Sequence, residues 1–168
     1  MKKILSVLLL IFCFSCDDGD LQIESIDFSA GTIQTCETVD VAQPSILFKI
    51  NSDEALILSL AANVFKNEEG TVALELTSTT ASTIIYRLFS GTVTNTYFCS
   101  DIPPTSPTVQ DEIVATTASI TITTTLDTTA TVPTHTHLIT ITAITLETGN
   151  NQRITNIGEN IFGTITTN

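Results

Sequence analysis

The chain has 168 residues, which is enough for one domain with a buried core. Its 18 acidic and six basic side chains give a formal net charge of −12 and include no basic cluster, which argues against direct binding to nucleic acid or to anionic headgroups. Threonine, isoleucine and valine are abundant, and because these β-branched side chains favour strands over helices, we expect an all-β domain.

The first residues have the layout of an export signal. Two lysines precede an apolar run over residues 4–14, which is shorter than the roughly 20 residues of a membrane-spanning helix and fits a secretory signal. Ser15 puts a small side chain directly before Cys16. This segment resembles the lipobox signal of bacterial lipoproteins. The resemblance implies that residues 1–15 are a cleaved signal peptide and that Cys16 is lipidated, becomes the first mature residue and anchors the protein to a membrane.

An acidic tether follows Cys16, since residues 17–20 read Asp-Asp-Gly-Asp. It resembles the acid-rich stretch of Bacteroidota lipoproteins that directs export to the outer face of the outer membrane, which implies surface display; the periplasmic face of that membrane is the alternative. Removal of residues 1–15 would leave four basic against 18 acidic side chains, a net charge of −14. Because the tether over 16–20 is short, we expect the domain to stay close to its membrane.

Apolar and polar residues alternate along the rest of the chain, with turn signals between the alternating stretches, which predicts an antiparallel all-β domain. Strands are expected over residues 21–28, 46–50, 56–60, 72–76, 84–88, 92–98, 118–126, 138–146 and 161–165. The stretch after residue 60 also fits one face of a helix, so a helical turn is expected there.

The connections between these strands favour a compact antiparallel fold. Ser90 and Gly91 predict a tight hairpin turn into residues 92–98, whereas the prolines within residues 101–107 predict a crossover loop. The two longest stretches predict a long hairpin with 127–134 in its connection. About nine strands in this order favour a two-sheet β-sandwich, loosely immunoglobulin-like, over residues 21–168 as one domain. A small β-barrel is the alternative.

Two cysteines would be left for bridging in the mature chain, Cys36 and Cys99. In an exported protein such a pair predicts a disulfide bond. The bond would tie the first strands to the end of the 92–98 segment. The closed loop of some 60 residues would stabilise the fold by roughly 4 kcal/mol in the chain-entropy model.

The two histidines, His135 and His137, would project to the same face of a strand. Two imidazoles at this spacing can ligate one metal ion. The alternative is that both are exposed polar side chains at the start of a strand, among threonines. No acidic or thiol residue lies at a short diagnostic spacing from them.

Sequence motifs of catalysis are missing, including the Gly-x-Ser-x-Gly elbow, the phosphate-binding glycine loop and the His-Glu-x-x-His helix. We therefore expect no enzyme activity and no cofactor. Asp127, Thr128 and Thr129 lie in a predicted exposed connection. They resemble the acceptor motif for O-glycosylation of exported Bacteroidota proteins, which implies that Thr128 carries a glycan.

The stretch 97–104, Tyr-Phe-Cys-Ser-Asp-Ile-Pro-Pro, together with the acidic tether, resembles uncharacterised flavobacterial lipoproteins. This resemblance implies a compartment but no known activity. The first functional hypothesis is a non-catalytic surface lipoprotein, an interaction or structural module for a protein or glycan partner. The second is a small metal-binding accessory protein of the periplasm or outer membrane that uses His135 and His137.

Overall fold

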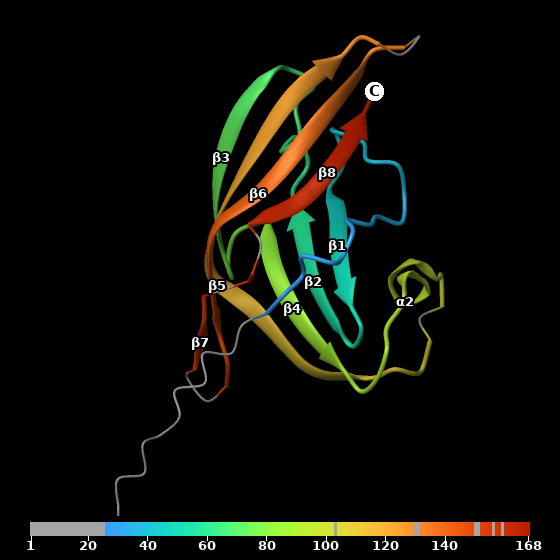
Figure 1. Cartoon of the computed structure of the whole chain (residues 1–168), viewed down its shortest axis with the longest axis vertical. Helices are drawn as coiled ribbons and strands as arrows, with labels where there is room; N and C mark the ends of the chain where they lie inside the picture. Colours follow the sequence, from blue (N-terminus) through green and yellow to red (C-terminus); the bar gives the residue numbers. More distant parts are fainter. Residues whose placement is uncertain (1–25, 103, 130–131, 150–151, 156, 159) are drawn as a thin grey trace, which may run out of the picture.

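Figure 1 shows a computed structural model that describes residues 26–168, except 103, 130–131, 150–151, 156 and 159. The predicted signal peptide, Cys16 and the acidic tether lie outside the described residues, as do the first residues of the strand expected over 21–28. The end of that stretch, Ile26 to Phe28, is not a strand, although both terminal side chains are buried in the core. In the part of the chain described, no helix is both long and apolar enough to cross a membrane.

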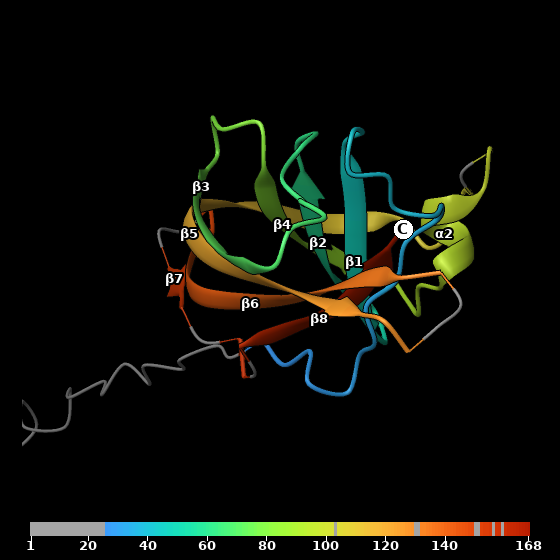
Figure 2. The same ribbon diagram turned by 90° about the horizontal axis from the view of Figure 1, so that it is seen from above.

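The described residues form an eight-stranded sheet. Its strands are β1 (Ser45–Asn51), β2 (Glu54–Leu60), β3 (Gly70–Thr77), β4 (Thr83–Phe89), β5 (Val109–Asp127), β6 (Thr134–Glu147), β7 (Arg153–Ile154) and β8 (Ile161–Thr167). They follow one another in the order β1-β2-β4-β5-β6-β7, while β3 pairs with β5 and β8 with β6, and every pairing is antiparallel. The sheet curls into a nearly closed barrel (Figure 2). The all-β prediction is confirmed, and the small barrel describes the architecture.

The long strand β5 belongs to both halves of the barrel. Its first part pairs with β4, up to Val114, and its second part pairs with β3, from Thr117 onward. Register shifts interrupt its pairing with β6 between Ala115 and Thr117 and again after Ser119, and such bulges bend a strand. The predicted hairpin of β5 and β6 is confirmed, and both strands are longer than the alternation in the sequence indicated.

The main core fills the inside of the barrel with leucine and isoleucine side chains. Alternate residues of each strand point inward, which places fully or nearly fully buried side chains at Leu47, Leu56, Leu58, Leu60, Ile84, Ile120, Ile122, Ile139, Ile141 and Leu146. In β2, β4 and β5 these residues belong to the apolar half of the period-two pattern seen in the sequence, whereas in β1 the alternating residues Ile46, Phe48 and Ile50 lie on the outer face.

The segment before β1 fills the gap between β1 and β8. Gln34 forms an isolated antiparallel bridge with Phe48 of β1, while Ile33 packs against Gly163 of β8. A Cβ atom at Gly163 would lie only 2.6 Å from the Cβ of Ile33, and the φ angle of this glycine is +151°. The segment therefore needs glycine at position 163 to approach β8.

Two of the predicted elements are wrong. Residues 92–98 were expected to form a strand after a tight hairpin turn at Ser90 and Gly91, but Asn95–Cys99 forms the short helix α2 and these described residues form no hairpin. The reason is that Tyr97 and Phe98 both pack against Phe89, whereas neighbouring residues of a strand point to opposite faces. The expected helical turn after residue 60 is instead an irregular connection in which Asn63 has a positive φ of 62°.

Candidate functional site

A second apolar cluster lies on the outside of the barrel, against β1, β2 and β4. Phe48, Ile57 and Ile85 are directly opposite one another across these three strands, and they point away from the main core. This outer cluster buries Phe48, Ala55, Ile57, Phe89 and Val93. Outward-facing side chains of a small barrel are usually polar where they meet water, so this face needs a cover.

Helix α2 provides part of the cover. The ring of Phe98 stacks on Phe48, with centroids 4.4 Å apart, and the ring of Tyr97 meets Phe89 edge to face at 4.9 Å. The helix is too short to be stable alone, so these ring contacts hold it on the sheet. α2 therefore owes its position to tertiary packing.

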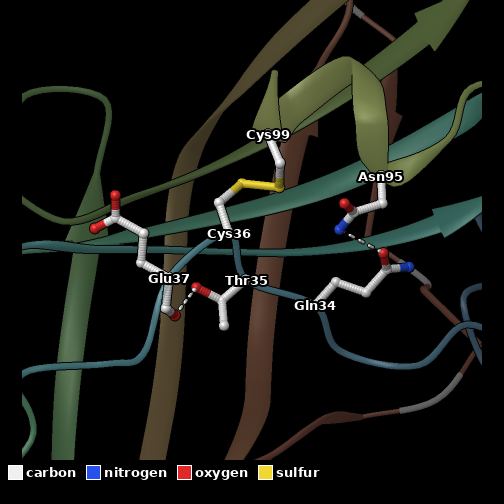
Figure 3. The surroundings of a disulfide bond; sticks show 6 residues. All are labelled: Gln34, Thr35, Cys36, Glu37, Asn95 and Cys99. Carbon is white, nitrogen blue, oxygen red and sulfur yellow. Dashed lines mark hydrogen bonds between the residues drawn. A yellow bond between two sulfur atoms is a disulfide. The ribbon is translucent and has the colours of Figure 1, made fainter. Parts of the chain in front are cut away.

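The Cys36–Cys99 disulfide, which confirms the prediction, ties the segment before β1 to the end of α2 (Figure 3). The two Cα atoms are 5.1 Å apart, within the ordinary range for a disulfide. Beside it, Nδ2 of Asn95 donates a hydrogen bond to Oε1 of Gln34 at 3.1 Å. Both links fix one end of the segment 35–44 relative to the sheet.

A groove of about 690 Å³ lies between the segment 35–44, α2 and the outer face of β1, β2 and β4. Its apolar lining consists mainly of Val39, Ile46, Phe48, Ile57, Ile85 and Phe98. The volume is within the range of natural ligand sites. Ile46 is the most exposed side chain of this apolar lining, at 59%.

The polar lining of the groove is divided between its two sides. Ser59 and Thr83 put hydroxyl groups on the sheet side, where Arg87 lies further along β4. Glu37 and Asp40 lie on the opposite side, in the segment that the disulfide holds. The backbone N–H of Ala42 donates to Oδ1 of Asp40 at 2.9 Å, which fixes a turn at that point.

The positive charge of Arg87 is already paired. Arg87 and Glu112 are directly opposite each other on β4 and β5, and Nε of Arg87 donates to Oε2 of Glu112 at 2.5 Å. Among the described residues of the groove, Arg87 is the only basic one. Since Glu112 neutralises it, the carboxylates of Glu37 and Asp40 leave the groove with a net negative charge.

The two histidines lie away from this groove. His137 is completely buried inside the barrel, so the interpretation of both histidines as exposed is wrong for this residue. Nδ1 of His137 lies 2.8 Å from Oγ1 of Thr124, and Nε2 lies 2.8 Å from Oγ1 of Thr167. His137 continues the inward-facing row of Ile139 and Ile141 along β6, and the ring of Phe65 packs against it with centroids 5.0 Å apart.

The hydrogen bonds around His137 define its protonation state. The hydroxyl of Thr167 donates to Oδ1 of Asn67, so Oγ1 of Thr167 accepts from Nε2–H of His137 and Nδ1 then accepts from Thr124. Burial lowers the pKa of His137 below its ordinary value of 6.5, and the neighbouring His135 lowers it further. His137 is therefore a neutral structural side chain.

This geometry gives the metal hypothesis no support. Both ring nitrogens of His137 are occupied by hydroxyl groups. His135 lies on the same strand and has a buried Nδ1 atom without a hydrogen-bond partner. Within the described part of the chain, no group of three His, Cys, Asp or Glu side chains could hold a metal ion.

Thr128 is exposed in the connection between β5 and β6, where a glycan would have room. Oδ1 of Asp127 accepts hydrogen bonds from the backbone N–H and from the hydroxyl of Thr129, at 2.8 and 2.6 Å. These bonds lower the pKa of Asp127. They also turn the chain so that Thr128 lies at the start of the loop.

Sequence reasoning missed the groove, although the sequence contains a signal for it. Residues 46–48, 55–58 and 84–86 are apolar on consecutive positions, a pattern typical of strands that are covered on both faces. Comparisons with models of protein families, with curated proteins and with solved structures found no match for this chain.

Proposed function

We propose that this protein is an exported, lipid-anchored, non-catalytic binding module that engages a protein partner through the groove beside α2. The observation that carries the proposal concerns the apolar floor of the groove, formed by Ile46, Phe48, Ile57 and Ile85. This floor is open to water at Ile46, which is 59% exposed, while Phe48 and Ile57 are buried. A groove lined by apolar side chains and bordered by polar ones is typical of a binding site, and Ile46 belongs to such a lining. The disulfide supports the proposal because it holds one wall of the groove in place before a partner arrives.

A protein partner fits the groove better than a glycan does. Sugar-binding sites use large exposed aromatic rings, whereas the chain has no tryptophan and the ring of Phe48 is fully buried. Aliphatic side chains dominate the exposed part of the floor. They match the aliphatic side chains of a peptide segment more closely than a hydroxylated ring.

The lipid anchor would keep the groove near the membrane. Cys16 precedes Ile26 by ten residues, and ten extended residues reach at most about 35 Å. The first described residues enter the barrel at the end where β7 lies (Figure 1), and Asp27 approaches Gly158 there. Partners of the module are therefore expected among proteins that act at the same membrane surface.

Site-specific photo-crosslinking in intact cells tests this proposal. A photoreactive residue at position 46 or 83 would lie in the groove, while one at position 138, which is 38% exposed on β6, serves as the control. We expect the same partner protein to be crosslinked from both groove positions and not from the control. Adducts that are equal at all three positions, or no adduct from the groove, would contradict the proposal.

A further inference from the structure

We infer that the partner of this groove presents a short peptide segment that combines one or two aliphatic side chains with a basic side chain. This inference rests on the proposed function and specifies the chemistry of the partner. It follows from the size of the apolar floor, from the hydrogen bonding of the strands beneath it and from the charges at its rim.

The floor is large enough for only one or two side chains. It crosses β1, β2 and β4, and adjacent strands lie about 4.8 Å apart, so the floor is about 10 Å wide. Along the strands it extends from Ile46 to Phe48, which corresponds to about 7 Å. A leucine or isoleucine side chain from a partner would contact Ile46 or Ile85, which lie at opposite corners of this floor.

The partner would be recognised by its side chains and not by adding a strand to the sheet. β2 is hydrogen-bonded to β1 on one edge and to β4 on the other, and the free edge of β1 is engaged by Gln34. The polar groups that remain accessible in the groove belong to side chains such as Ser59 and Thr83. Specificity is therefore expected to come from the shape and charge of the partner's side chains.

The charges of the groove favour a basic group. Glu37 and Asp40 line one side, and the one basic residue of the described lining, Arg87, is neutralised by Glu112. The whole chain is also strongly acidic, at −12, so its field attracts cations over a longer range. A lysine or arginine beside the aliphatic anchor would meet Glu37 or Asp40, whereas an acidic residue there would be repelled.

Binding of three fluorescent eight-residue peptides to the purified protein tests the inference. The first peptide has two leucines flanked by lysines, the second has glutamates in place of the lysines, and the third has serines in place of the leucines. We expect the first to bind with a Kd on the order of 100 μM. The other two should bind at least about tenfold more weakly, as measured by fluorescence anisotropy at low salt.

Charge-neutral variants identify the rim residues responsible. Glu37→Gln with Asp40→Asn should weaken binding of the lysine peptide roughly threefold to tenfold. The matched control is Glu68→Gln with Glu69→Gln, which removes two carboxylates outside the groove and should leave the Kd unchanged. Thermal unfolding of both double variants shows that each is folded.

The possible results distinguish failure of the proposed peptide chemistry from failure of the groove as a binding site. Equal binding of the lysine and glutamate peptides, equal effects of the two double variants, or no peptide binding at all would overturn the inference. The crosslinks from positions 46 and 83 test the proposed function independently of these peptides. A crosslinked homodimer that Ile46→Asp abolishes would assign the groove to a second copy of this chain and would also overturn the peptide inference.

Discussion

His137 shows how one residue can couple the stability of the barrel to pH. In the unfolded chain it takes up a proton near pH 6.5, whereas burial and the neighbouring His135 lower its pKa in the folded barrel. At pH values between the pKa of His137 in the folded protein and its pKa in the unfolded chain, the unfolded state binds more protons than the folded state. The free energy of unfolding therefore falls as the pH drops below about 6.5, and it is highest above that value.

The variant His137→Gln should abolish this contribution. At pH 7.5 we expect it to be less stable than the wild type by about 1–3 kcal/mol, because the hydrogen bonds to Thr124 and Thr167 are disturbed. The difference should shrink as the pH is lowered from 7.5 to 5, since only the wild type carries the penalty of protonating this side chain. Urea unfolding at a series of pH values measures it.

The carboxylates with shifted pKa values do not disturb that measurement. Hydrogen bonds from Ser29 and Thr129 lower the pKa of Asp27 and Asp127 below 3.8. These groups stabilise the fold above pH 3.8, and their contribution is lost only as the pH falls further. A difference between wild type and His137→Gln that stayed constant from pH 7.5 to 5 would contradict the role assigned to His137.

Gly163 makes a second prediction at the scale of one residue. Gly163→Ala should lower the free energy of unfolding by about 2–4 kcal/mol, because the new Cβ would strain a φ of +151° and collide with Ile33. Gly91→Ala is the matched control, since nothing lies within 4 Å of a Cβ there, and it should change stability by less than about 1 kcal/mol. Urea unfolding compares them, and equal effects would argue against the packing of residue 33 on β8.

At the scale of elements, the positions of three strands were predictable from the sequence. Residues 46–50, 56–60 and 84–88 each form a strand within one or two residues of the predicted ends, although the period-two pattern did not show that these three strands are covered on both faces. Helix α2 was not predictable from local pattern, because five residues hold too few hydrogen bonds to be stable alone. It forms because the rings of Tyr97 and Phe98 pack against Phe89 and Phe48. Contacts between residues far apart in the sequence cannot be read from local periodicity.

The same reason explains why the site was predicted only in part. The pairing of Cys36 with Cys99 was predicted because they are the two cysteines outside the expected signal peptide and lipidation site, so the prediction needed no knowledge of the fold. The groove depends on which face of β1, β2 and β4 is left uncovered once α2 has docked. The burial of His137 depends on the register of β6 against β5 and β8, which local alternation does not determine.

The disulfide makes a prediction for the segment 35–44 and α2 together. Replacing Cys36 and Cys99 by serine opens a loop with a sequence separation of 63 residues, which should lower the free energy of unfolding by up to about 4 kcal/mol. We expect the far-ultraviolet circular dichroism of the barrel to be kept, while tyrosine fluorescence changes as Tyr97 becomes more mobile. Hydrogen exchange should rise in 34–44 and 93–99 and stay unchanged in β5 and β6; uniform exchange throughout would contradict a local role.

At the scale of the whole molecule, the barrel has two distinct ends. β7 lies at the end where the described chain begins, and the connection between β5 and β6 lies at the opposite end (Figure 1). If Cys16 carries the anchor, the first end faces the membrane and the loop with Thr128 faces away from it. The groove beside α2 lies on the flank, where a partner in the same membrane can reach it.

This orientation leads to a prediction for intact cells. Cys16→Ser should move the protein from the membrane fraction to the soluble fraction, and it should abolish labelling by a clickable palmitate analogue. A protease site inserted after Thr128 should be cut in intact cells if the protein is displayed on the surface, while a site inserted after Gly149, near β7, should be cut more slowly because the membrane shields it. Ser29→Ala, in the exposed turn after Phe28, is the control and should change neither fractionation nor labelling.

Full membrane retention of the Cys16→Ser protein would refute the lipid anchor. Protection of both inserted sites would place the domain on the periplasmic face, because there the anchor is kept but the protease cannot reach the barrel.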